Sequence, residues 1–166
     1  MITIKTNIDS FQSDFETRVD SISLNEILEK IGFYQENEIK KRFDTSSDAE
    51  GKSWKALKHR KGYPLRDKGA LMGSFNTTIS GSSVKVWTDK IYANIHDQGG
   101  VIESKVIEPK NKQALCFTIN GTKYFSKRVV MPRVVIPQRK FSGISSKNTE
   151  DIEKLIKDYM TKKLNK

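Results

Sequence analysis

Few residues of this 166-residue chain could do chemistry. His96 followed by Asp97 is half of a metal-binding or acid–base pair, and the single cysteine, Cys116, is a candidate nucleophile. Cys116 lies in the apolar run 114–117, however, where cysteine is typically a small packing residue. We expect His96 to hydrogen-bond the backbone of the Gly-Gly turn at 99–100 instead. The sequence therefore predicts no catalytic residue, and it predicts neither a metal nor a cofactor.

The run Gly-Lys-Ser at 51–53 matches the end of a phosphate-binding loop. The full motif needs a glycine five positions earlier, where this chain has Ser46, and a buried strand before it. Asp48 and Glu50 would also repel a triphosphate from the loop that has to hold it. These departures argue against a nucleotide site.

Composition favours one domain over residues 1–166, with residues 1–22 as a strand or an N-terminal arm. A hydrophobic content of 36% with 30% charged residues is compatible with a small core and extended, solvated elements. The chain has no run of 18 apolar residues and no signal-peptide pattern, so we expect a soluble protein made in the cytoplasm. With one cysteine, an intrachain disulfide is impossible.

Charge is distributed unevenly within a formal net charge of +10. Residues 1–50 contain 6 Lys or Arg and 11 Asp or Glu, whereas residues 51–166 contain 24 and 9. No acidic residue occurs in the stretch 109–149, which holds nine Lys or Arg. Such a stretch favours a phosphate backbone or an acidic protein surface, and solvated lysines on a hairpin are the alternative. An acidic N-terminal part and a basic C-terminal part also suit head-to-tail contacts between copies.

Periodicity predicts a helix at each end of the chain. The capping box 23–26 begins the first helix, which extends to about residue 43 despite Gly32. A short helix is expected after Asp67, a single helical turn at 92–97, and a last helix at 148–164. The apolar faces of the two long helices carry Leu24, Ile27, Leu28 and Ile31 in one, and Ile152, Leu155, Ile156 and Tyr159 in the other.

Between the helices, alternation and turn residues predict antiparallel strands. The expected strands are 76–80, 84–88, 105–108, 114–119 and 123–131, followed by an edge segment at 133–136. The Asn-Gly pair at 120–121 is the strongest short hairpin signal, and the prolines at 132 and 137 confine the last segment to a sheet edge. The predicted class is α+β, with an antiparallel sheet, an extended hairpin and long loops.

Several motifs follow one another in an order that resembles a known family. They are Gly-Lys-Ser-Trp-Lys-Ala-Leu at 51–57, Gly-Ala-Leu-Met-Gly-Ser-Phe at 69–75, Val-Lys-Val-Trp at 84–87, Tyr-Ala-Asn-Ile-His-Asp-Gln-Gly-Gly at 92–100 and Ile-Pro-Gln-Arg-Lys-Phe-Ser-Gly at 136–143. Together they are similar to the phage virion morphogenesis family, the tail-completion or head–tail joining proteins of Mu-like phages and prophages. The likeness covers about residues 24–160, and Lys140 stands where the family tends to carry a proline.

The resemblance implies a structural protein, not an enzyme, that completes the tail or joins tail to head. The implied partners are further copies, with a ring as one arrangement, and other phage tail or head-neck proteins. The protein would occupy the host cytoplasm during assembly and the tail or neck of the mature virion, without membrane contact. We expect the loops 44–64 and 99–113 to become ordered on contact with neighbours.

The motifs supply two sets of candidate residues. The expected assembly interface is Trp54, Arg133, Arg139, Lys140 and Phe141, and the expected structural set is Gly51, Gly69, Leu71, Tyr92, His96, Gly99 and Gly100. Trp54 is expected to pin its loop by burial, with the indole N–H left for a partner. Arg139 and Phe141 are expected to project from the segment after the rigid proline at 137 toward a neighbour. Tyr92 and Ile95 are expected to point inward.

Two rival functions make different predictions. A DNA-binding protein using the stretch 109–149 would bind DNA as a monomer, with a steep salt dependence. Tyr124 and Phe125 would suit base stacking, although we expect ordinary packing, with one of the two facing the core. A hydrolase would bring His96, Asp97 and Cys116 within hydrogen-bond reach of one another.

Overall fold

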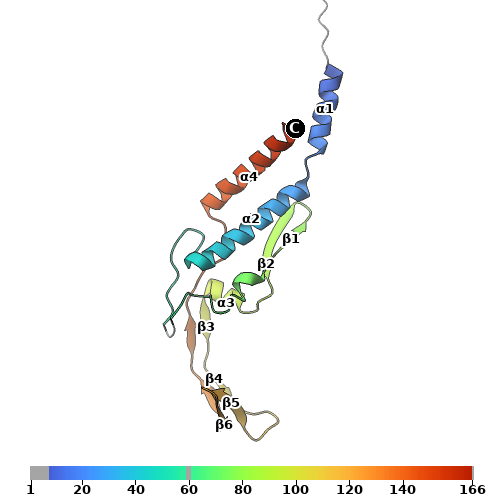
Figure 1. Cartoon of the computed structure of the whole chain (residues 1–166). Coiled ribbons are helices and arrows are strands. Elements are labelled where there is room, and N and C mark those ends of the chain that lie inside the picture. Colours follow the sequence, from blue (N-terminus) through green and yellow to red (C-terminus); the bar gives the residue numbers. More distant parts are fainter. Residues whose placement is uncertain (1–7, 59–60, 166) are drawn as a thin grey trace, which may run out of the picture. The chain divides into compact units, whose positions relative to one another are not determined.

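The computed structural model describes residues 8–58 and 61–165 and divides the chain into two compact units (Figure 1). One unit is Met1–Ile91 with Lys140–Lys166, and the other is Tyr92–Arg139. The described helices are α1 (Ile8–Asp20), α2 (Leu24–Thr45), α3 (Ala93–Gln98) and α4 (Ser146–Leu164), with a 3-10 turn at Met72–Ser74. All the strand pairs are antiparallel, and the predicted α+β class is confirmed.

Helix α2 begins at the predicted cap, but the cap is completed from another helix. Glu26 N donates to Ser23 Oγ (3.3 Å), as a capping box requires. The return bond from Glu26 is missing, because Ser23 N donates to the Tyr159 hydroxyl of α4 (3.1 Å), which in turn donates to Glu26 (2.8 Å). The start of α2 is therefore fixed to the end of α4, and Figure 1 shows the two helices side by side.

Gly32 lets the hairpin of β1 (Phe75–Ser80) and β2 (Ser83–Thr88) pack closely against α2. A Cβ atom at position 32 would lie 2.3 Å from Thr77 Cγ2 and 2.9 Å from Val84 Cγ2. Glycine in a helix interior costs about 1 kcal/mol relative to alanine. Here that cost is offset by the close approach of the two elements, which the sequence periodicity does not reveal.

We expect Gly32→Ala to lower the free energy of unfolding by about 2 kcal/mol. Overpacking costs about 1–3 kcal/mol, and we expect a cost near the upper end because the new methyl group would overlap the stiff, β-branched Thr77. The better helix propensity of alanine offsets about 1 kcal/mol of this cost. Urea unfolding followed by circular dichroism measures the change. Adding Thr77→Ser removes the nearest atom and should recover part of the loss, and a Gly32→Ala variant more stable than wild type would contradict the assignment.

The core of the first unit is an aromatic cluster around Phe43, whose side chain is 0% exposed. Its ring centroid lies 5.6 Å from Trp54, 6.0 Å from Phe75 and 5.3 Å from Phe141. Phe75 and Phe141 also meet edge to face at 5.7 Å. Four segments, namely the end of α2, the loop after it, the start of β1 and the segment before α4, are thus held by one cluster.

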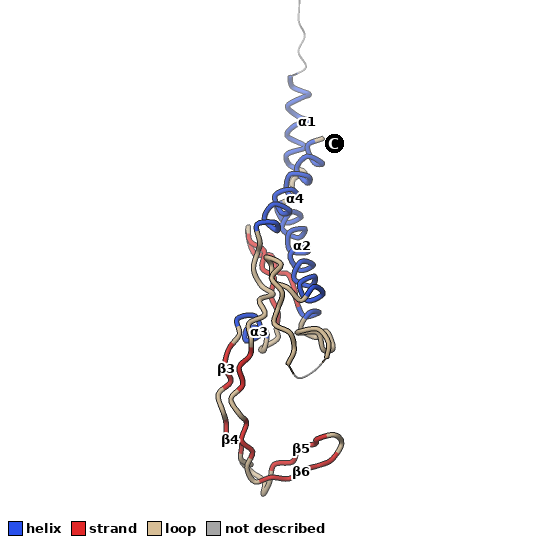
Figure 2. Tube along the Cα trace, turned by 90° about the vertical axis from the view of Figure 1, so that its left-hand side faces the viewer, coloured by secondary structure: helices blue, strands red, loops and turns tan. Residues whose placement is uncertain are grey.

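The second unit is mostly a long two-stranded ribbon, which Figure 2 shows as two tubes running side by side through β3 and β4. β3 (Gly100–Ile102) pairs with β8 (Val134–Ile136), and β4 (Lys105–Ile107) pairs with β7 (Val129–Met131). β5 (Leu115–Ile119) and β6 (Thr122–Ser126) form the terminal hairpin. The predicted Asn-Gly turn is confirmed, with φ of 49° at Asn120 and 83° at Gly121.

Several local predictions are wrong. Residues 8–20 form helix α1 where a strand or arm was predicted, while residues 1–7 lie outside the described part. Its apolar residues recur at helical spacing (8, 11, 15 and 19), a pattern that the alternating isoleucines at 2, 4 and 8 obscure. The helix expected after Asp67 is only the 3-10 turn, since the glycines at 69 and 73 disfavour helix.

The predicted strand 123–131 and the predicted loop 99–113 also need correction. The strand is interrupted after β6, because Ser126 Oγ donates to Arg128 O (2.6 Å) and accepts from Arg128 N (3.2 Å), a local turn. The loop contains both β3 and β4, so much of it is already ordered by strand pairing. α4 begins at Ser146, capped by Ser145, two residues before the predicted start. In the described residues no helix is long and apolar enough to cross a membrane.

Candidate functional site

Trp54 and Phe141, both expected at an assembly interface, are instead buried. Trp54 is 8% exposed and Phe141 4% exposed, because both rings pack on Phe43. Trp54 pins its loop as predicted, but its indole N–H is not left for a partner: it donates to Lys140 O (3.2 Å). Phe141 does not project outward, so that expectation is wrong. Both rings are used to close the core of the first unit around Phe43.

Arg42, which is not among the predicted site residues, holds the segment before α4. It is 4% exposed, and its Nη1 donates to Phe141 O (2.7 Å) and Gly143 O (2.9 Å). Its Nη2 donates to Asn148 Oδ1 (2.9 Å). Arg42 follows Ile39 by three residues on the buried side of α2, and that position is the sequence signal that identifies it.

Asn148, which is 2% exposed, joins Arg42 to the first turn of α4. Its Oδ1 accepts from Ser145 N (3.1 Å), and its own N–H donates to Ser145 Oγ (3.1 Å). Its Nδ2 donates to the Tyr34 hydroxyl (3.1 Å) and to Glu38 Oε2 (3.2 Å). Burial raises the pKa of Tyr34 above its ordinary value. The network positions α4 on α2, and none of its groups is arranged as a nucleophile and base pair.

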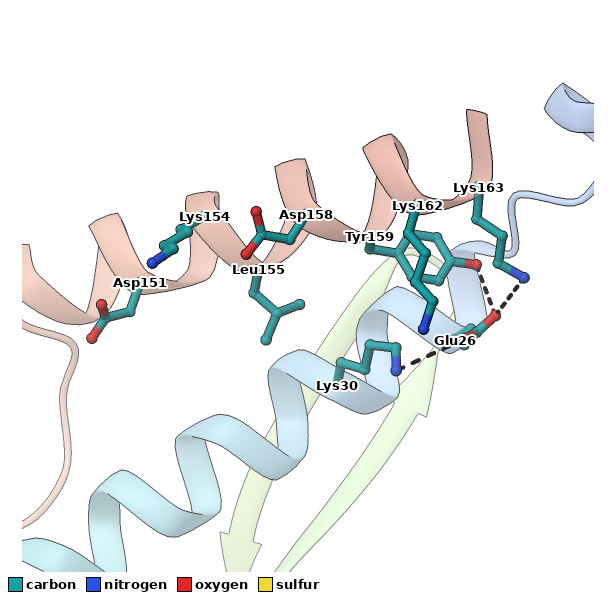
Figure 3. A pocket seen from close by; sticks show the side chains of 9 residues that line it. All are labelled: Glu26, Lys30, Asp151, Lys154, Leu155, Asp158, Tyr159, Lys162 and Lys163. Carbon is teal, nitrogen blue, oxygen red and sulfur yellow. Dashed lines mark hydrogen bonds and ion pairs between the residues drawn. The ribbon is translucent and has the colours of Figure 1, made fainter. Parts of the chain in front are cut away.

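A groove of about 480 Å³ lies between α2 and α4, and its lining side chains carry both signs of charge (Figure 3). At one end Glu26 accepts hydrogen bonds from Tyr159 (2.8 Å) and Lys163 (3.2 Å). The Tyr159 hydrogen bond, followed by that of Lys163, lowers the pKa of Glu26 below its usual value. Lys30 adds a longer ion pair at 3.9 Å. These pairs account for the charges at that end as helix-packing contacts.

The turn after α3 requires glycine at position 99. Gly99 has φ of +75°, and a Cβ there would lie 2.8 Å from Gln138 N. A Cβ at Gly100 would lie 3.1 Å from Ile95 Cγ1, so Ile95 packs against this turn as expected. Tyr92, in contrast, is 40% exposed, and the expectation that it points inward is wrong. The most specific motif of the sequence thus builds the base of the ribbon.

His96 makes a different contact from the one expected. Its backbone carbonyl accepts from Arg139 N (2.9 Å), but its side-chain Nδ1 is buried and has no hydrogen-bond partner among the described residues. Its ring meets Tyr92 edge to face at 6.1 Å. Burial, and then the positive charge of Arg139, lowers the pKa of His96 below its ordinary 6.5. The imidazole is therefore a neutral packing group.

This depressed pKa makes stability depend on pH. The unfolded chain takes up a proton at His96 near pH 6.5, whereas the folded chain does so only at lower pH. The contribution of neutral His96 to the free energy of unfolding is therefore present above pH 6.5 and is lost as the pH falls through the pKa of the folded state. We expect His96→Gln to lose less stability than wild type between pH 7.5 and pH 5.5. Parallel urea titrations at the two pH values test this, and equal losses in both proteins would show that His96 does not titrate as stated.

The remaining candidates lie in different places. Arg133 is exposed in the ribbon, with its Nε 3.5 Å from Glu103 Oε1, while Arg139 is 7% exposed, so it does not project freely as expected. Lys140 is exposed. Leu71 is buried, and the glycines at 51 and 69 have positive φ with nothing within 4 Å of a Cβ. The structure therefore does not gather the five predicted interface residues into one exposed patch.

Cys116 and its neighbours correct the expectation of ordinary packing. Cys116 is exposed in β5, and Tyr124 and Phe125 in β6 are 46% and 71% exposed. In the described part of the chain most residues of β5 and β6 are exposed, so alternation along the strand does not bury every second residue. Figure 2 shows β5 at the opposite end of the ribbon from α3, so Cys116 is not brought to His96. In the described residues no three His, Cys, Asp or Glu side chains gather as a metal site.

Comparison with known proteins gives one match. No curated protein and no solved structure matches the chain. The model of the phage virion morphogenesis family matches residues 13–161. This range extends from within α1 to the last turns of α4 and covers all of the second unit and most of the first. The chain belongs to the phage virion morphogenesis family, and its role is a structural or assembly role in the phage particle.

Proposed function

We propose that this protein completes the phage tail, joins the tail to the head, or does both, as one subunit of an oligomer in the neck or tail end. Membership of the family supports the coarser role. The finer role is supported by the apolar surface that the second unit exposes, since soluble monomers rarely leave such surfaces uncovered. Its most exposed members include Phe125 (71%), Val135 (63%), Val130 (59%) and Ile119 (51%).

An isolated two-stranded ribbon is at best marginally stable in water. Among the described residues each strand pair of the second unit is two-stranded, so none of these pairs has a third strand beside it. Neighbouring proteins in an assembly would supply a further layer, and the candidates are further copies and other phage tail or head-neck proteins. The protein would then work in the host cytoplasm during assembly and remain in the tail or neck of the virion. Arg133 and Lys140, which are exposed, remain candidates for such contacts.

The proposal is tested by electron microscopy of phage particles made without this protein. We expect filled heads and full-length tails that fail to attach, and restoration of infectious particles when the wild-type gene is supplied in trans. Mass measurement of the purified chain over a concentration series should show oligomers. Normal infectious particles in the absence of the protein would overturn the proposal.

DNA binding through the stretch 109–149 is the second candidate. It is favoured by the exposed cations Lys110, Lys112, Lys123, Lys127 and Arg128, which have no acidic residue among them. This function predicts that the monomer binds duplex DNA with a logarithmic salt slope of about −0.9 per phosphate contacted. Measurement of DNA affinity at several salt concentrations separates it from assembly, which predicts weak binding to DNA and strong binding between protein chains.

A further inference from the structure

The two central strand pairs of the ribbon share one register. The pairs β3–β8 and β4–β7 are separated by two residues on each strand, 103–104 on one and 132–133 on the other. The register is therefore unchanged across the gap, and Glu103 and Arg133 face each other there with an Nε–Oε1 distance of 3.5 Å. Pro132 explains the break, because it cannot donate a ladder hydrogen bond.

Continuity of register assigns side chains to two faces. Residues paired across an antiparallel ladder share a face, and alternate residues share it too. One face, which we call the uncharged face, carries Gly100, Ile102, Ser104, Val106, Val130, Pro132, Val134 and Ile136. Glu103, Lys105 and Arg133 all lie on the opposite face. Ile102, Val106 and Val130 are 42%, 43% and 59% exposed, so no described part of the chain covers the uncharged face.

Charges beyond this face indicate the chemistry of whatever covers it. The segment at 109–128, which includes the hairpin of β5 and β6, has five cations and no acidic residue, and one of these cations, Arg128, pairs with Glu108 just before the segment at 4.0 Å. A suitable partner is therefore apolar along one side and acidic. Nucleic acid fits this surface poorly, because the uncharged face carries no cation that could contact a phosphate and the cations lie at the hairpin.

Helix α1 has these properties. It carries four acidic residues and a single basic one, Arg18. In the sequence, residues 8, 11, 15 and 19 form an apolar stripe at helical spacing, and of this stripe the structure describes the side chains of Phe15 and Val19, which are 52% and 43% exposed. Its 13 residues span about 20 Å, and the eight residues from 100 to 107 span about 26 Å, so the helix fits within the length of the uncharged face.

We propose that α1 of one copy packs on the uncharged face of the ribbon of a second copy, with its carboxylates toward the cations of the terminal hairpin. This inference rests on the proposed function, and it names the contact that joins its subunits. Because the helix and the ribbon are different surfaces, each copy binds one neighbour through its α1 and a second neighbour through its ribbon. Such a heterologous contact closes into a ring or continues as a chain.

The test uses the full chain with one substitution on each surface and a matched control for each. Val130→Asp places a charge on the uncharged face, and Val135→Asp places the same charge on the opposite face at a similarly exposed position (63%). Val19→Asp changes the stripe of α1, and Thr17→Asp changes an exposed position of the same helix. Circular dichroism first verifies that all four variants fold.

We expect Val130→Asp and Val19→Asp each to weaken self-association at least about tenfold in sedimentation velocity, while the two controls associate like wild type. A 1:1 mixture of the two defective variants retains one intact pair of surfaces, so it should form a dimer and nothing larger. Equal effects of Val130→Asp and Val135→Asp, absence of the mixed dimer, or a wild-type chain that remains monomeric at every concentration would overturn the inference.

Complementation of phage lacking the gene separates this inference from the proposed function. Failure of Val130→Asp with success of Val135→Asp supports both. Success of all variants, when the wild-type gene is required, rejects the α1 contact but leaves the assembly function intact. Binding of a short DNA duplex by the monomeric wild type is a further outcome. If Val130→Asp leaves this binding unchanged and Lys127→Glu abolishes it, the hairpin is a DNA-binding surface and the α1 contact is rejected.

Discussion

Replacing Phe43 with alanine is expected to lower the free energy of unfolding by about 3–5 kcal/mol. The ring is fully buried and lies within 6.0 Å, centroid to centroid, of three other aromatic rings. Removing it leaves a cavity where four chain segments meet, and those segments cannot all move in to fill it. The loss would be a large part of the 5–15 kcal/mol that a typical domain has. Urea unfolding followed by circular dichroism measures it.

Phe33→Ala is the matched control for this change. Phe33 lies on the same helix but is 69% exposed, so its removal should change stability by no more than about 0.5 kcal/mol. Near-ultraviolet circular dichroism should also change in the Phe43 variant alone, because the environment of Trp54 depends on the Phe43 ring. Similar losses for the two phenylalanines would show that the aromatic cluster is not the core of this unit.

The second large effect is expected for Arg42→Met, which keeps much of the apolar stem and removes the guanidinium. Three acceptors, Phe141 O, Gly143 O and Asn148 Oδ1, lose a charged donor in a buried place. Each hydrogen bond to a charged group contributes about 1.5–3 kcal/mol. Part of the summed loss is offset because the variant no longer has to remove a guanidinium from water, so we expect the free energy of unfolding to fall by about 3 kcal/mol.

Lys41→Met provides the comparison, since Lys41 is the preceding residue and forms only an exposed ion pair with Glu38 at 3.3 Å. Its loss should stay within about 0.5 kcal/mol. Arg42→Lys should rescue only partly, because a single ammonium cannot reproduce the planar fork that reaches three acceptors. A double-mutant cycle with Asn148→Ala should give a coupling energy of about 0.5–3 kcal/mol. Additive losses would mean that Arg42 and Asn148 act independently.

Turns and helix starts were predictable where the cause is local. Ser23 caps α2 because its own side chain reaches an amide three residues away, and the Asn-Gly pair at 120–121 turns because both residues tolerate positive φ. The start of α4 shows the limit of such reasoning. Its cap at Ser145 depends on Asn148, which also serves Arg42 from a distant helix, and the apolar periodicity alone placed the start two residues late.

Burial was the property that sequence patterns predicted least well. Alternation in 114–119 correctly indicates a strand, and alternation in 123–131 indicates what are two strands, but Cys116 and Phe125 are exposed because no second layer covers the hairpin in the described part of the chain. Conversely, Arg139 and Phe141 were expected to project toward a neighbour and are buried, and Arg42, for which no role was predicted, is buried as well. A pattern shows that two sides of an element differ, and it does not say which side another segment will cover.

For this protein, the amino-acid sequence by itself determined the α+β class and the main turns, because these depend on hydrogen bonds and dihedral angles within a few residues. It also determined membership of the family, because the motifs are residue types in a fixed order. The tertiary structure alone decided which aromatic rings form the core and which apolar side chains stay in water. That decision depends on contacts between segments about 100 residues apart, such as Arg42 with Phe141, and no short-range rule fixes them.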